Sequence, residues 1–292
     1  MSVRLFAGGA LALLFSVSVF AQANERVLYV NAWNKETRAP MTGLGPSDFA
    51  VEEDGRRREI LRVTPATSPM SVAILVDNTQ ASQNRVSETR NALTAFTKEL
   101  QGIGPIAIIG VADRPTILAD YSTNPKQIED GIGKIFAMSG SGATMLDAIV
   151  EVSKGLTKRE EDRISIVALT AENVEFSTRH YNDVLEELGK GGAMFHAVIL
   201  NTPAGTRLND ETRNLASVMD RGPREHGGTR VDVLSSQAFE PKMKELALIL
   251  KNQYRVVYAR PQTLIPPSKI EVTATKAGVE ANGSQARGQA TK

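Results

Sequence analysis

The sequence feature that most constrains the fold is the apolar run SVAILVD at residues 71–77, which shows almost no alternation of polar and apolar side chains. Strands of this kind are typical of parallel sheets that helices cover on both faces. A short polar segment, residues 78–82, follows it and leads into apolar residues at helical spacing. The run therefore predicts a buried strand whose last residue, Asp77, lies at the carboxyl edge of an α/β sheet, where such folds bind ligands.

The chain repeats this alternation of strand and helix patterns as far as residue 260. Further strands are expected within 105–122 (two, joined at Arg114-Pro115) and at 163–170, 193–200, 229–233 and 254–260, and helices at 84–101, 124–137, 144–156, 178–188, 209–220 and 239–252. Alternation of this kind predicts an α/β fold, Rossmann-like, with a mostly parallel sheet and helices on both of its faces.

Both ends of the chain outside this region carry β patterns. Residues 27–33 alternate, residues 48–63 read as a hairpin that turns at Asp54-Gly55, and residues 269–276 alternate again. The last residues are small and polar. We therefore expect a domain order that runs along the chain as follows: signal peptide 1–23, N-terminal β segment 24–67, α/β domain 68–261, C-terminal strand within 262–277 that joins the β appendage, and flexible tail 278–292.

The first 23 residues have the pattern of a secretory signal. Arg4 precedes the apolar residues 5–20, and Ala21-Gln22-Ala23 forms a small-x-small cleavage site. The alternative is an uncleaved anchor, but 16 apolar residues fall short of the ~20 that span a bilayer. There is no cysteine, so the protein cannot form a disulfide or carry a lipid on a cysteine. We expect export to the periplasm or beyond, with no membrane span after cleavage.

The charge balance points to no polyanionic partner. The formal net charge is +1, and Arg4 is the one charged residue among the first 23, so basic and acidic residues balance in the rest of the chain. A basic patch or a strong net charge is the usual sign of a protein that binds nucleic acid. We therefore expect an unidentified protein partner and no nucleic acid.

Three segments resemble the metal-site segments of the von Willebrand factor A-type (VWA) domain: SVAILVDNTQAS at 71–82, GATMLDAI at 142–149 and IVALTAEN at 166–173. Residues 42–60 and 250–261 resemble the flanking segments of a secreted bacterial branch of VWFA-related proteins. The resemblance covers about residues 27–277. It implies a Rossmann-like fold with a metal-ion-dependent adhesion site, where magnesium is bound through carboxylates, hydroxyls and waters and helps to bind a protein.

Matched residue by residue, that site is incomplete. Asp77 stands for the first Asp of the family's Asp-x-Ser-x-Ser motif, Thr79 for the first Ser, and Thr144 for the Thr of the second loop. Ala81 replaces the second Ser, and Ala171 replaces the Asp of the third loop. The resemblance therefore implies a degenerate adhesion site that has lost one hydroxyl and one carboxylate.

Two interpretations of the site stay open. Asp77, Thr79 and Thr144 could hold magnesium weakly with waters completing the shell, or the site could be kept for loop packing. Ser82 and Glu172 lie one residue out of register and could substitute if a loop shifts. The residues expected to form the partner-binding edge are Asp77, Asn78, Thr79, Ser82, Ser141, Thr144 and Glu172.

The nearest enzymatic alternative is a haloacid-dehalogenase-like phosphotransferase with Asp77 as its nucleophile. That chemistry also needs an acidic pair for magnesium, and the expected strand end at 197–205 has no carboxylate. We predict no catalytic residue and no enzymatic activity. We predict an exported recognition or adhesion-type module that uses the carboxyl edge of a VWA-like sheet, and a purely structural envelope component is a further alternative.

Overall fold

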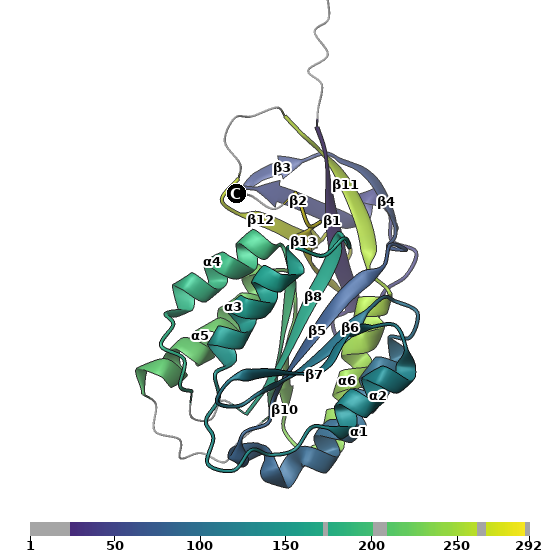
Figure 1. The fold of residues 1–292 in the computed structure, drawn as a ribbon. Coiled ribbons are helices and arrows are strands. Elements are labelled where there is room, and N and C mark those ends of the chain that lie inside the picture. Colours follow the sequence, from purple (N-terminus) through teal and green to yellow (C-terminus); the bar gives the residue numbers. More distant parts are fainter. Residues whose placement is uncertain (1–23, 172–174, 201–208, 262–266, 290–292) are drawn as a thin grey trace, which may run out of the picture.

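The computed structural model describes residues 24–171, 175–200, 209–261 and 267–289. A six-stranded sheet with the order β10-β9-β8-β5-β6-β7 forms its centre (Figure 1). All neighbours in it are parallel except β7, which runs antiparallel to β6. The strands are β5 (Met70–Asp77), β6 (Ile106–Val111), β7 (Pro115–Ser122), β8 (Arg163–Thr170), β9 (Met194–Leu200) and β10 (Arg230–Val233). The predicted fold class, including the buried strand that ends at Asp77, is confirmed.

Helices cover both faces of this sheet, as Figure 1 shows. One face carries α1 (Val86–Glu99), α2 (Pro125–Gly133) and α6 (Ser236–Lys251), and the other carries α3 (Met145–Leu156), α4 (Tyr181–Gly191) and α5 (Asp210–Glu225). Alternate side chains of β5 enter two separate cores: Ile74 packs with the first set of helices and Leu75 with the second. None of the described helices is long and apolar enough to cross a membrane.

The β appendage consists of two small sheets, with the strand orders β13-β1-β11-β4 and β12-β2-β3. The predicted hairpin turn is present, and Asp54 and Gly55 have the positive φ angles, 47° and 73°, that a type I′ turn requires. A third core, which includes Phe49, Tyr254 and Tyr258, belongs to this appendage. Its strands are β1 (Asn24–Asn34), β2 (Phe49–Glu53), β3 (Arg56–Arg58), β4 (Ile60–Pro65), β11 (Tyr254–Arg260), β12 (Ile270–Ala274) and β13 (Val279–Gln285).

Two sequence predictions need correction here. The strand at 254–260 was expected to close the α/β series, but β11 pairs antiparallel with β1 and β4 in the appendage. The expected flexible tail, 278–292, instead contains β13, which pairs with β1 over 28–34. A β ladder is made by backbone groups, so the small residues of β13 form one without an apolar pattern of their own.

Buried hydrogen bonds join the appendage to the amino edge of the central sheet. Arg163, the first residue of β8, is 3% exposed. Its guanidinium donates to the Gln253 side chain (2.9 Å) and to the carbonyl oxygens of Ser68 (2.8 Å) and Leu250 (2.9 Å). Gln253 donates in turn to the Asn31 side-chain oxygen at 2.8 Å. The appendage therefore covers the amino edge and leaves the carboxyl edge at the opposite end of the molecule (Figure 1).

Candidate functional site

Asp77 lies at the carboxyl edge with only 5% of its surface exposed. Its Oδ1 accepts hydrogen bonds from the Thr79 backbone N–H (3.1 Å) and hydroxyl (2.8 Å). Its Oδ2 accepts longer ones from the Thr170 hydroxyl (3.5 Å) and the Ala171 N–H (3.4 Å) at the end of β8. The structure thus brings Asp77 and Thr79 together, and the carboxylate ties the loop after β5 to the loop after β8.

Thr144 lies at the same edge, but its hydroxyl bonds to a backbone carbonyl and not to Asp77. The residue is the N-cap of α3, and its Oγ1 donates to the carbonyl oxygen of Ala112 at 2.9 Å. Ala112 follows β6, so this bond joins the start of α3 to the loop between β6 and β7. Within the described part of the chain, no hydrogen bond joins Thr144 to Asp77.

Asn78 and Ser82, two further residues of the predicted edge, hold the loop after β5. The Asn78 side-chain amide donates to the carbonyl oxygen of Phe136 at 3.1 Å, and the Asn78 carbonyl accepts from the Met138 N–H at 2.9 Å. The Ser82 hydroxyl donates to the Thr79 carbonyl oxygen at 2.7 Å. These side chains therefore stabilise the fold of the edge, and both are largely buried.

The two other predicted residues differ in what can be said of them. Ser141 is partly exposed, and its hydroxyl donates to the Met138 carbonyl oxygen at 2.6 Å, which closes the tight turn between α2 and α3. Glu172 lies outside the described residues.

The residues at this edge fit a magnesium ion poorly. Magnesium takes six oxygen ligands in near-octahedral geometry and retains several waters. Here Asp77 and Thr79 are hydrogen-bonded to each other, the Thr144 hydroxyl donates to a backbone carbonyl, and Ala81 and Ala171 have no side-chain oxygen. Among the residues that the structure describes, no group of three or more His, Cys, Asp or Glu could hold a metal.

Glu175 is an important acid at this edge that the sequence analysis did not single out. It is fully buried, and its carboxylate accepts from the backbone N–H groups of Met145 (3.2 Å), Leu146 (3.4 Å) and Ser177 (3.2 Å). Burial raises the pKa of the Glu175 carboxyl to about 7, and these hydrogen bonds oppose the rise. The acid follows Ala171 by a few residues, but no spacing rule connects it to the start of α3.

Three large apolar side chains surround the same edge and are more than half exposed: Phe136 (61%), Met138 (52%) and Phe176 (56%). We call them the apolar rim. The guanidinium of Arg90 lies 4.4 Å from the centre of the Phe136 ring, and the Phe176 ring packs against Gly142 and leaves no room there for a Cβ. Aromatic and Met side chains are enriched in protein interfaces, which makes these three exposed residues candidates for an interaction site.

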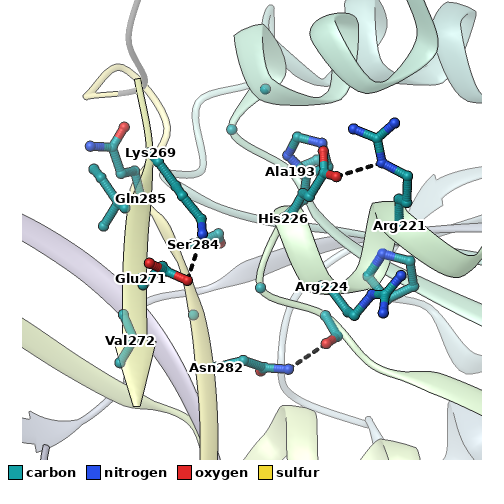
Figure 2. Close-up of a pocket in the computed structure, with 18 of the residues that line it drawn as sticks. Ala193, Arg221, Arg224, His226, Lys269, Glu271, Val272, Asn282, Ser284 and Gln285 are labelled. Carbon is teal, nitrogen blue, oxygen red and sulfur yellow. Dashed lines mark hydrogen bonds and ion pairs between the residues drawn. The ribbon is translucent and has the colours of Figure 1, made fainter. Parts of the chain in front are cut away.

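A cavity of ≈ 760 Å³ lies elsewhere, between the appendage and the C-terminal end of α5 (Figure 2). Its charged side chains are in ion pairs: Lys269 with Glu271 (2.7 Å) and Arg221 with Glu225 (2.7 Å) within the lining, and Arg224 and Arg230 with Asp220 and Asp232 outside it. It opens beside the amino ends of β9 and β10, and none of the predicted site residues lines it. The cavity and the carboxyl edge are therefore separate features.

The fold can be compared with known proteins. No protein-family model and no curated protein matches this sequence. Among solved structures, the von Willebrand factor type A protein from Catenulispora acidiphila superposes with a TM-score of 0.51 at 8% identity, over 91% of this chain and 72% of that one.

Smaller solved structures are also similar. The conserved hypothetical protein BatB from Bacteroides thetaiotaomicron gives a TM-score of 0.49 at 15% identity, over 63% of this chain and 100% of that one. The vWF domain of the type V pili tip protein Mfa5 from Porphyromonas gingivalis gives 0.48 at 9% identity, over 62% and 95%. The superposition on the Catenulispora acidiphila protein, at 8% identity, indicates the fold and not the activity. The chain has the von Willebrand factor A-type fold that its sequence resembles.

Proposed function

We propose that this chain is an exported, non-catalytic recognition module that binds a protein partner at the carboxyl edge of its central sheet, with little or no dependence on a divalent cation. The observation that carries the proposal is that this edge combines a carboxylate bonded within the protein with exposed apolar side chains. Both carboxylate oxygens of Asp77 accept hydrogen bonds from the protein itself, and the apolar rim beside them is open to solvent.

The surroundings of Asp77 support a binding role over catalysis. Within the described residues, its hydrogen bonds all come from neutral groups, on Thr79, Thr170 and Ala171. A phosphotransferase nucleophile works beside a magnesium ion that other acids help to hold. Turnover of p-nitrophenyl phosphate that Asp77→Asn abolishes would overturn the non-catalytic proposal.

The apolar rim has the properties of an interface centre. Aromatic residues and Met are enriched in protein interfaces, and a few such residues supply most of the binding energy. Phe136 is restrained by Arg90, whose guanidinium also donates to the Ile135 carbonyl oxygen at 3.0 Å. A restrained, exposed ring loses little conformational entropy when a partner covers it.

Export is proposed from the sequence, where Arg4, the apolar residues 5–20 and the small-x-small site at Ala21-Gln22-Ala23 form a secretory signal. A cleaved protein in the periplasmic or secreted fraction, with an N-terminus at Asn24, is the expected result. Recovery of the uncleaved chain in the cytoplasm would contradict it.

Site-specific photo-crosslinking tests the docking surface. p-Benzoyl-phenylalanine at position 136 or 176 should give the same cross-linked adduct in cells, with or without EDTA during irradiation. Ile117 is a matched control, because it is 66% exposed and apolar but lies on the edge strand β7 and is not part of the apolar rim. An adduct from position 117 alone, or one that EDTA abolishes and magnesium restores, would overturn the proposal.

A further inference from the structure

We propose that Glu175 is a built-in anchor that organises the carboxyl edge in the place of a cation. Its carboxylate fastens residues 175–177 to the start of α3, and this positions Phe176 for docking. The contacts of this anchor all lie within the chain. The docking role of Phe176 rests on the function proposed above.

The first step is the contact between Glu175 and the helix. The first N–H groups of an α-helix have no partner within the helix, and they favour negative charge. In α3 two of these groups, on Met145 and Leu146, donate to the Glu175 carboxylate at 3.2 Å and 3.4 Å. The Thr144 side chain makes no capping bond of its own. A carboxylate from a distant segment therefore performs the capping.

In the second step, residues 175–177 are bonded to the start of α3 and to the residue Ala143 that precedes it. The Phe176 N–H donates to the Ala143 carbonyl oxygen at 2.7 Å. The Ser177 hydroxyl accepts from the Asp147 N–H at 3.1 Å, and the Ser177 N–H donates to Glu175 at 3.2 Å. Glu175 before Phe176 and Ser177 after it are both hydrogen-bonded to α3. The backbone of Phe176 is therefore held on both sides.

The third step concerns the Phe176 ring. Its ring atoms Cδ2, Cε2 and Cζ lie so close to Gly142 that no larger residue fits there, and the side chain is still 56% exposed. The ring is thus fixed by the loop on one side and open to a partner on the other. Gly142 and Glu175 therefore both position the Phe176 ring.

The acids near Glu175 have their partners within the chain. Asp147 at the start of α3 is neutralised by Arg179, whose guanidinium lies 2.5 Å from it. Glu175 itself is held by neutral amides, while Asp77 joins the loops after β5 and β8. Together the two acids connect the loops that a coordinated metal would otherwise hold together.

Amide hydrogen exchange of the mature protein in EDTA tests the anchor. In Glu175→Ala the amides of Met145, Leu146, Phe176 and Ser177 should exchange roughly tenfold faster or more, as expected when a buried hydrogen bond is lost. Glu175→Gln, which keeps one accepting oxygen, should lie between that variant and wild type. Glu151→Ala is the matched control, since Glu151 is exposed on the same helix, and it should leave these amides unchanged. Unchanged exchange in Glu175→Ala overturns the anchor.

A second measurement needs no variant. In an NMR titration of the wild-type protein, the amide protons of Met145, Leu146 and Ser177 should shift together with the Glu175 carboxyl carbon. Amide proton shifts whose pH dependence differs from that of the Glu175 carboxyl carbon would overturn the anchor. If position 176 gives no adduct while exchange behaves as expected, the docking proposal fails and the anchor stands. If exchange in Glu175→Ala is normal while wild type still cross-links, the anchor fails and the docking proposal stands.

Discussion

The two edges of the central sheet are built differently. At the amino edge, the buried guanidinium of Arg163 donates to Gln253, Ser68 and Leu250, and the appendage covers it. At the carboxyl edge, Asp77 and Glu175 join neighbouring loops of the same domain. No described segment covers the apolar rim, whose side chains are more than half exposed.

One edge of the sheet is therefore covered by the appendage, and the other is exposed and accessible to a partner. Buried polar groups that are fully paired specify one arrangement and strongly resist opening. Loops that carry function belong to the parts of a protein with fewer buried contacts. We therefore expect substitutions at the amino edge to act on the stability of the whole chain, and those at the carboxyl edge to act mainly on local order and binding.

The largest effect is expected at the amino edge, for Arg163→Ala. The change leaves the Gln253 side chain and the Leu250 carbonyl without their donor inside the protein. The free energy of unfolding should fall by roughly 3–5 kcal/mol, measured by urea denaturation. Arg62→Ala is the control, because the Arg62–Glu25 pair is exposed, and it should change stability by less than about 1 kcal/mol. Equal losses of stability in Arg163→Ala and Arg62→Ala would contradict the special role of the amino edge.

A pH titration of stability should separate Glu175 from the rest of the chain. Burial raises its pKa from 4.5 to about 7, so the folded state binds the proton more tightly than the unfolded state. The free energy of unfolding should therefore fall as pH rises from 4.5 to 7, by at most roughly 3 kcal/mol from this group.

Other groups titrate in the same range, so the measurement compares wild type with Glu175→Gln. Buried His196 has its pKa lowered to about 3, and it contributes stability that is lost as pH falls below 6.5. That contribution is common to both proteins and cancels in the difference. An identical pH dependence in the two proteins would contradict the raised pKa of Glu175.

Asp77→Ala should lower the free energy of unfolding by roughly 1–3 kcal/mol, because it removes the carboxylate that accepts from the Thr79 N–H and hydroxyl. The loss should be the same in EDTA and in magnesium. Calorimetric titration with magnesium and manganese sharpens this test: wild type should show no tight binding, and a double variant, Ala171→Asp with Ala81→Ser, should gain it. Tight binding by wild type would show that the site still functions as a metal site.

The smallest effect on stability is expected for Phe176→Ala, within about 0.5 kcal/mol, because the ring is largely exposed. Binding should respond far more, with cross-linking from position 136 reduced roughly tenfold or more. Ile117→Ala is the control and should alter neither quantity. Loss of stability without loss of cross-linking would place Phe176 in the core of the fold and not in the docking surface.

Much of the fold could be predicted from local patterns. The apolar run that ends at Asp77, the helical stripe with Leu93 and Phe96, and the turn at Asp54-Gly55 each report the structure of their own segment. Pairing partners are not local. β11 has the pattern of a buried strand in either sheet, and β13 has no apolar pattern, so their places beside β1 could not be predicted from the sequence.

The candidate site divides in the same way. The sequence by itself determined the available chemistry: Asp77 offers one carboxylate, and Ala81 and Ala171 can offer no ligand. Only the tertiary structure decided which groups those oxygens meet, since Glu175 reaches the start of α3 across about thirty residues of chain, and the apolar rim gathers side chains from two loops. Hydrogen bonds and burial depend on the distance between groups in space. For segments far apart along the chain, that distance is set by the tertiary fold and cannot be read from their separation in the sequence.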